Sequence, residues 1–114
     1  MKNQLIIAEF FMGLEEVTLH ELVSNWFFDE DTCSIISPGE TFFLTKREFV
    51  FIQLLQKRRV VTYEQMLCHI WEQKLDVTHN AIKSFVKNFK KKMPPFILKN
   101  VSGVGYRLQI YEKD

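Results

Sequence analysis

The chain has 114 residues, which is enough for one domain with a hydrophobic core and too few for two. It has only two cysteines, Cys33 and Cys68, and its one apolar run near the start, residues 5–14, is interrupted by Glu9 and too short to cross a bilayer. We therefore expect a soluble, reduced, cytoplasmic protein with no membrane segment.

Charge is distributed unevenly along the chain. Residues 1–43 hold one Lys and eight acidic residues, a net charge of −7. Residues 44–114 hold fourteen Lys and Arg and six acidic residues, a net charge of +8, so the overall +1 conceals a basic C-terminal part. This asymmetry is typical of a polyanion-binding region joined to a region that avoids the polyanion, although charged runs are also common on ordinary solvent-exposed faces.

The N-terminal third predicts short strands and one helix. Residues 4–7 are a short candidate strand. Thr18 has Glu21 three residues later, which is the spacing of a capping box, so we predict a helix from Thr18 toward Trp26. Apolar runs separated by turn-rich segments then predict an antiparallel β-meander at residues 26–28, 33–36 and 41–44.

Three further helices are predicted by the same N-terminal pattern. Thr45, Thr62 and Thr78 can each accept hydrogen bonds from a first helical turn, and Glu48 and Gln65 complete capping boxes for the first two. Hydrophobic staples bracket these caps at Leu44/Phe49, Val61/Met66 and Val77/Ile82.

The last of these helices is strongly amphipathic and is followed by a hairpin pattern. Between residues 80 and 93 apolar residues recur at helical spacing, the opposite face is rich in lysine, and Pro94 and Pro95 end the helix. Residues 96–110 predict two strands with a turn near Ser102 and Gly103. A basic helix joined to a hairpin allows one domain to contact both a groove and the backbone of a duplex.

Four segments resemble the OmpR/PhoB-type winged-helix DNA-binding domain of bacterial response regulators over residues 26–110. They are Leu44-Thr-Lys-Arg-Glu-Phe49, Met66-Leu-Cys-His-Ile-Trp71, the lysine-rich run Ile82 to Met93, and Val101-Ser-Gly-Val-Gly-Tyr-Arg-Leu108. The resemblance implies an α+β winged helix-turn-helix fold with an N-terminal antiparallel meander, a three-helix core and a C-terminal hairpin wing. It also implies a sequence-specific double-stranded-DNA-binding transcription regulator of a two-component system.

The resemblance has departures and a boundary. Ser102 stands where the family commonly has Arg, and Lys87 and Asn88 stand where arginines are usual. We divide the chain into an extension, residues 1–25, and a winged-helix domain, residues 26–114. The family usually has a phosphorylated receiver domain, for which 25 residues are too few. We therefore interpret the chain as a fragment or as a regulator without that switch, and the extension as a receiver remnant, a dimerising element or a cover for the sheet.

The candidate DNA contacts lie on the third helix and on the wing. Lys83, Lys87, Lys90 and Lys91 lie on one helical arc and are candidates for phosphates, and the uncharged Asn80, Ser84 and Asn88 are candidates for base edges. On the wing the candidates are Lys99, Asn100, Ser102 and Arg107, whereas we interpret Tyr106 as a packed ring. The family position of Trp71 implies that its indole N–H reaches a phosphate, although its pattern also fits the core.

The resemblance also implies partners beyond DNA, namely RNA polymerase through the loop at residues 72–77 and a homodimer on tandem half-sites. We predict no cofactor, no metal and no enzymatic activity, because His69 and the two cysteines lack zinc-ligand spacing and no phosphate-binding glycine loop is present. The alternative is a winged-helix protein–protein interaction module that does not bind DNA specifically. Ser102 and the low net charge favour that alternative.

Overall fold

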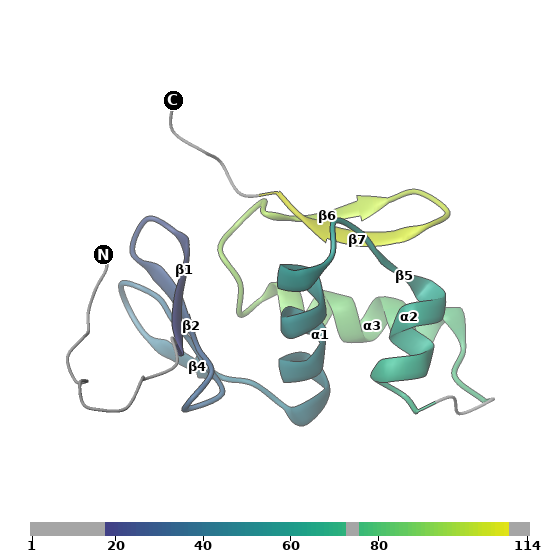
Figure 1. Ribbon diagram of the computed structural model, residues 1–114, viewed down its shortest axis with the longest axis horizontal. Helices are drawn as coiled ribbons and strands as arrows, with labels where there is room; N and C mark the ends of the chain where they lie inside the picture. The colour runs from purple at the N-terminus through teal and green to yellow at the C-terminus, as the bar shows by residue number, and fades with distance from the viewer. Residues whose placement is uncertain (1–17, 73–75, 110–114) are drawn as a thin grey trace, which may run out of the picture.

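The computed structural model describes residues 18–72 and 76–109, so the candidate strand at residues 4–7 lies outside the described part. Two antiparallel sheets and three helices make up these described residues (Figure 1). In the view of Figure 1 the N-terminal sheet lies to the left of the helices and the C-terminal sheet lies above them. The predicted α+β arrangement of meander, helices and hairpin is confirmed.

The N-terminal sheet is a four-stranded antiparallel meander. Its strands pair in chain order and are β1 (Leu19–Val23), β2 (Trp26–Asp29), β3 (Ser34–Ile36) and β4 (Thr41–Phe43). Leu22, Phe28 and Ile35 are buried in the core, so one face of the sheet packs on the rest of the molecule. Asn25 has a φ of 69°, a left-handed conformation that Asn tolerates, and turns the chain between β1 and β2.

The predicted helix from Thr18 is wrong, because the residues after Thr18 form β1. His20 lies opposite Phe28 in the ladder, and the Glu30 N–H donates to the Thr18 carbonyl at 2.7 Å. Only five residues separate Thr18 from the turn, which is too short for a stable helix. The division of the chain at residues 25 and 26 stays a prediction, although β1 and β2 on either side of it share one sheet.

The first two helices begin at the predicted caps. They are α1 (Lys46–Lys57) and α2 (Tyr63–His69). The Glu48 N–H donates to Thr45 Oγ1 at 3.2 Å, and the Thr45 N–H donates to Glu48 Oε1 at 2.9 Å. Thr62 and Gln65 make the same reciprocal pair, so both predicted capping boxes are confirmed.

The third helix, α3 (His79–Lys90), begins at the predicted cap and ends before the predicted position. Thr78 Oγ1 accepts from the Ala81 N–H at 3.1 Å. The pattern predicted helix up to Met93, but the chain turns after Lys90 and leads into Pro94. The Lys92 and Met93 N–H groups donate to the carbonyls three residues back, at Phe89 and Lys90, so the helix tightens into turns before Pro94. Met93 is still buried in the core.

The C-terminal sheet contains the wing hairpin. Its strands are β5 (Val61–Thr62), β6 (Leu98–Val101) and β7 (Gly105–Leu108), paired in the order β5-β7-β6. Gly103 turns the hairpin with a φ of +74°, which confirms the predicted turn. At Gly105 a Cβ would lie 1.9 Å from the Val61 carbonyl oxygen, so only glycine allows β5 to approach β7.

Aromatic rings join the helices to the wing. Phe51 of α1 contacts Phe85 and Phe89 of α3, with ring centroids 5.5 and 5.1 Å apart. It also meets Tyr106 of β7 edge to face at 6.2 Å. Tyr106 is buried, which confirms its interpretation as a packed ring, and burial beside Tyr63 raises the pKa of its phenol. Within residues 18–72 and 76–109, no helix has the length and apolar character needed to cross a membrane.

Candidate nucleic-acid interface

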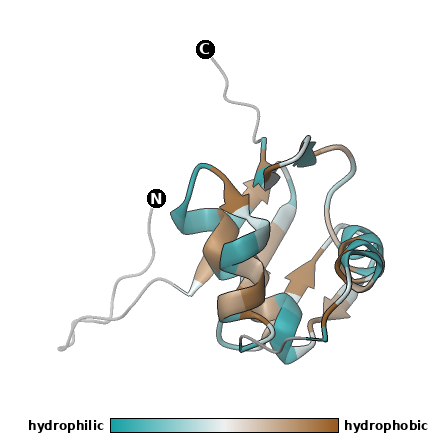
Figure 2. Ribbon diagram, turned by 90° about the vertical axis from the view of Figure 1, so that its right-hand side faces the viewer, coloured by the Kyte–Doolittle hydropathy of each residue, from teal (hydrophilic) through white to brown (hydrophobic). Residues whose placement is uncertain are grey.

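α3 has one buried face and one exposed face. Ile82, Val86 and Phe89 are buried in the core. The predicted DNA-contacting residues of α3 and its C-cap are all exposed, and these are Asn80, Lys83, Ser84, Lys87, Asn88, Lys90 and Lys91. Figure 2 shows α3 nearly end-on at the edge of the molecule, with hydrophilic residues facing outward. The exposed face is therefore accessible to a partner as large as a duplex.

The charges on this exposed face are not evenly spread. Lys83, Lys87 and Lys90 follow one another at helical spacing and form one row. Ser84 and Asn88 form the neighbouring row, which is uncharged until Lys91 at the C-cap of the helix. The lysine row borders the wing, because Lys90 lines a cleft with wing residues, whereas Asn88 lines a cleft with the start of α1.

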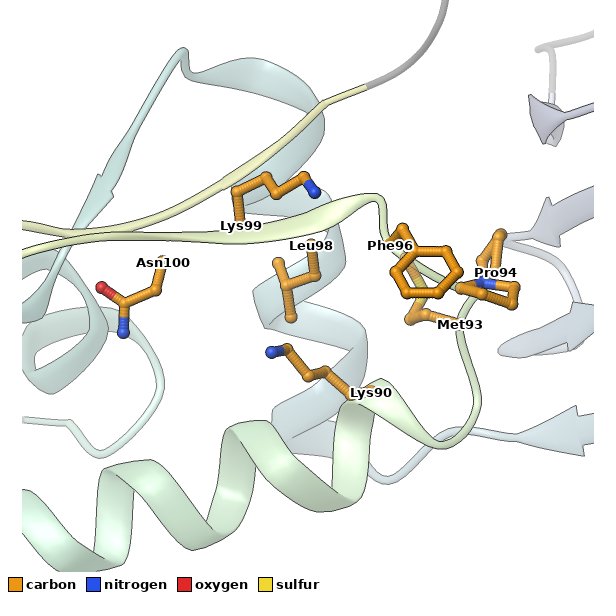
Figure 3. Close-up of a pocket in the computed structure, with 8 residues that line it drawn as sticks. Lys90, Met93, Pro94, Phe96, Leu98, Lys99 and Asn100 are labelled. Carbon is orange, nitrogen blue, oxygen red and sulfur yellow. The ribbon is translucent and has the colours of Figure 1, made fainter.

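The cleft between α3 and the wing has a volume of about 480 Å³ and joins two of the predicted groups. Lys90 reaches from α3 toward the first wing strand, and Asn100 points from that strand to the same side (Figure 3). Leu98 forms part of the apolar lining between them. Lys99 stands on the other face of the strand (Figure 3), so it is not aimed at Lys90.

Two wing cations instead lie opposite each other in the hairpin. Lys99 is the cross-strand partner of Arg107, and directly opposed residues of a ladder share one face. Both are half-buried, and Arg107 Nη2 donates to Gln109 Oε1 at 3.1 Å. Like charges in this position are destabilising unless an anion or solvent screens them. The pair is therefore suited to an anionic partner on the outer face of the wing.

The tip of the wing carries no cation. Ser102 and Gly103 are exposed at the turn, and Val104 beside them is 43% exposed. The hydroxyl of Ser102 can donate one hydrogen bond, but it cannot replace the charge of an arginine.

Trp71 differs from the other candidates because it is buried, with only 6% of its surface exposed. Its ring meets Phe85 edge to face at 5.1 Å. Arg47 Cζ lies 5.6 Å from the centre of the same ring, a cation–π geometry. Trp71 thus supports an exposed cation, and its predicted contact with a phosphate stays a prediction.

Sequence reasoning missed three cations. Lys46 and Arg47 are exposed at the start of α1, next to the exposed face of α3. Lys92 Nζ donates to Glu48 Oε1 and to the Phe43 carbonyl oxygen, both at 2.8 Å, so it links α3, α1 and β4. The sequence did contain a signal for Lys46 and Arg47. Cations in the first turn of a helix interact unfavourably with the helix dipole, so their presence there suggests a binding role.

Metal chemistry finds no support at the described residues. Across residues 18–72 and 76–109, no group of three or more His, Cys, Asp or Glu side chains is placed to hold a metal ion.

Comparison with known proteins identifies relatives of this arrangement. Residues 39–108 match the family described as "Transcriptional regulatory protein, C terminal". The regulatory protein VanRB of Enterococcus faecalis is 35% identical over 77 residues, which are 66% of this chain and 35% of VanRB. The chain thus spans about a third of the length of that relative.

Solved structures share the fold. The DNA-binding domain of the response regulator AdeR, in complex with an intercistronic region, is 27% identical with a TM-score of 0.63. The match covers 83% of this chain and all of that domain. DrrB, an OmpR/PhoB homologue from Thermotoga maritima, is 24% identical with a TM-score of 0.66, and the match covers 80% of this chain and 44% of DrrB. The predicted winged-helix fold is confirmed by these likenesses.

Proposed function

The chain belongs to the family of transcriptional regulatory protein C-terminal domains, and from this premise we propose that it is a sequence-specific regulator that binds double-stranded DNA. Its role is binding rather than catalysis. The observation that carries the proposal is the exposed face of α3, where every predicted contact is accessible while the opposite face is anchored in the core. A helix held in this way fits the major groove of B-DNA.

Each candidate residue has a role in this proposal. Lys83, Lys87 and Lys91 bind phosphates that border the groove, whereas Asn80, Ser84 and Asn88 reach base edges. On the wing, Lys99 and Arg107 hold a backbone phosphate between them, and Asn100 and Ser102 donate hydrogen bonds beside it. Trp71 acts from beneath as a support for Arg47.

The acidic meander faces away from the DNA in this arrangement. Residues 18–43 contain five acidic residues and no Lys or Arg, so they repel phosphates. The proposal extends, on the family resemblance, to a homodimer on tandem half-sites and to a contact with RNA polymerase. The structure of AdeR with an intercistronic region supports the DNA-binding part, because that domain aligns with 83% of this chain.

Selection from genomic fragments across a salt series tests the proposal. We expect one enriched motif and, for about five phosphate contacts, a slope of log affinity against log salt of about −4 to −5. The double variant Lys87→Glu, Lys91→Glu should lose binding and keep its melting temperature. The matched control Arg58→Glu, Arg59→Glu makes the same charge change at the exposed end of α1 and should keep most of the binding.

A protein-interaction module is the second candidate, and the wing tip without a cation favours it, together with Phe96, which is 79% exposed. Absence of DNA binding even at low salt, in a folded protein, would reject the DNA proposal and support this alternative.

A further inference from the structure

The two flanks of α3 differ in where their charge comes from. On the wing flank the helix itself supplies a row of lysines, Lys83, Lys87 and Lys90. On the flank toward α1 the helix presents the uncharged Asn88 to the neighbouring cleft, and the helix cation nearest to it is Lys91, about one turn further on at the C-cap. A duplex groove is bordered by two phosphate backbones, so cations on both sides of a groove-binding helix would strengthen binding.

A second cleft lies on the flank of Asn88, between α3 and the start of α1. Its volume is about 380 Å³, and it is lined by Thr45, Lys46, Arg47, Glu48, Phe85 and Asn88. Lys46 and Arg47 are exposed, and Phe85 is half-buried. The cleft therefore combines two cations, a hydrogen-bonding amide and an apolar ring, which are suited respectively to a phosphate, to its neighbouring polar groups and to a deoxyribose.

Arg47 is held in place by its neighbours. Its guanidinium carbon lies 5.6 Å from the centre of the Trp71 ring, and Trp71 in turn packs on Phe85 of α3. Stacking on a ring face leaves the N–H groups at the edge of the guanidinium to bind a phosphate. The contact also reduces the conformational freedom that the side chain loses when it binds.

The acidic residue of this cleft does not cancel the two cations. Glu48 Oε1 accepts from Lys92 Nζ at 2.8 Å and from the Thr45 N–H at 2.9 Å. Lys92 balances its charge, so the cleft keeps the full positive charge of Lys46 and Arg47. The two cations are adjacent, and the partial positive charge of the α1 N-terminus adds to theirs, so an anion between them would be stabilised.

We propose that Lys46 and Arg47 bind a phosphate of the DNA strand on the side of the major groove opposite to the wing. This inference rests on the proposed function and adds a contact that α3 and the wing do not provide. A helix with its side chains is about 10–12 Å across, close to the width of the major groove. Elements that flank α3 on both sides are thus able to reach the two backbones, and the α1 contact fixes how deeply Asn88 enters the groove.

The test compares the double variant Lys46→Gln, Arg47→Gln with the matched control Arg58→Gln, Arg59→Gln, which removes the same charge from the other end of α1. Binding to a labelled random-sequence duplex of about 24 base pairs, a little over two helical turns, is measured across a salt series. We expect the first variant, which loses one phosphate contact, to have a salt slope less steep than wild type by about 1, and the control to keep the wild-type slope. Equal slope changes in both variants would show a general charge effect and overturn the inference.

A second measurement locates the contact and does not depend on overall charge. Single methylphosphonates, which lack the phosphate charge, are placed along the duplex with the selected site. In wild type one position on the strand opposite the wing contact should weaken binding, and in the double variant that position should have no further effect. An undiminished loss in the double variant would overturn the inference. Arg47→Lys, which keeps the charge, should recover most of the salt slope and so exclude misfolding as the cause.

The two proposals fail in different ways. If wild type binds DNA with a steep salt slope and the Lys46, Arg47 variant matches it, only the α1 contact is rejected. If wild type binds no duplex at low salt, the proposed function fails and the α1 contact fails with it.

Discussion

The meander and the winged-helix part of this protein are built from similar antiparallel strands but differ in charge and in the range of their contacts. Residues 18–43 have five acidic residues and no Lys or Arg, and each strand pairs with its neighbour in sequence. The second sheet has the order β5-β7-β6 and joins segments far apart in the chain, next to the basic α3. The acidic sheet thus forms by local strand pairing, whereas the proposed binding surface depends on contacts between segments far apart in the chain.

The two parts share the hydrophobic core and are also joined by specific contacts. Phe28 of β2 meets Phe49 of α1 edge to face at 5.8 Å. Lys92, just after α3, donates to the Phe43 carbonyl of β4 and to Glu48 of α1. Substitutions in each part, and at the joint between them, can therefore be ranked by their expected effect.

The largest expected effect follows from adding one methyl group to a glycine of each part. Gly105→Ala places a Cβ against the backbone of β5 and should lower the free energy of unfolding by about 3 kcal/mol. Gly39→Ala, in a meander turn with nothing within 4 Å, should change it by less than about 0.5 kcal/mol. Urea denaturation of both variants measures this difference, and equal stabilities would contradict the close approach at Gly105.

The joint between the parts should be the next most sensitive position. Lys92→Met leaves the buried Glu48 carboxylate without its cation and should lower the free energy of unfolding by about 2 kcal/mol. Adding Glu48→Gln removes the unpaired charge and should recover about half of the loss, since glutamine can still cap α1. Chemical denaturation of the single and double variants measures the coupling, and strictly additive effects would argue against the pair.

A smaller effect distinguishes the two places where a Thr is followed by Glu three residues later, Thr18 in the meander and Thr45 before α1. Thr45→Ala removes a helix cap and should lower the free energy of unfolding by about 1 kcal/mol. Thr18→Ala, at the start of a strand, should cost less than about 0.5 kcal/mol. Thermal denaturation with both variants checks this, and a larger loss at Thr18 would indicate that its side chain has a structural role.

The smallest effect concerns alkaline pH. The pKa of Tyr106 is raised above 10.0 by burial and by Tyr63, so the unfolded chain loses this proton at lower pH than the folded chain. The free energy of unfolding should therefore fall as the pH rises above about 10, up to the folded pKa. In the Tyr106→Phe variant the free energy of unfolding should fall less steeply over that pH range, as measured by denaturation at each pH. If the free energy of unfolding of the variant depends on pH as steeply as that of wild type, Tyr106 does not contribute to the loss of stability at alkaline pH.

Prediction from the sequence succeeded where the determining contacts are local. The capping boxes at Thr45 and Thr62 are satisfied within four residues, so their patterns were sufficient. The same pattern at Thr18 failed because the nearby turn and the pairing with β2 decide that segment. Local patterns identify a helix start only where enough helix-forming sequence follows.

The candidate site was predicted only where it depends on residues close together in the sequence. The exposed face of α3 followed from helical spacing alone. The stack of Arg47 on Trp71 and the contacts of Lys92 join residues more than twenty positions apart, so no local pattern contains them. Lys99 and Arg107 lie opposite each other because of the strand register of the hairpin. The sequence located the turn only approximately, so it could not predict that register.

The two-residue strand β5 has a consequence for the order in which the protein forms during synthesis. Val61 pairs with Tyr106, so β5 leaves the ribosome 45 residues before its partner. The meander needs only neighbouring segments and is able to pair as soon as it is made, whereas pairing across a long separation is slower. The C-terminal sheet therefore closes last, and a chain that stops before Gly105 would lack the strand that joins β5 to the wing.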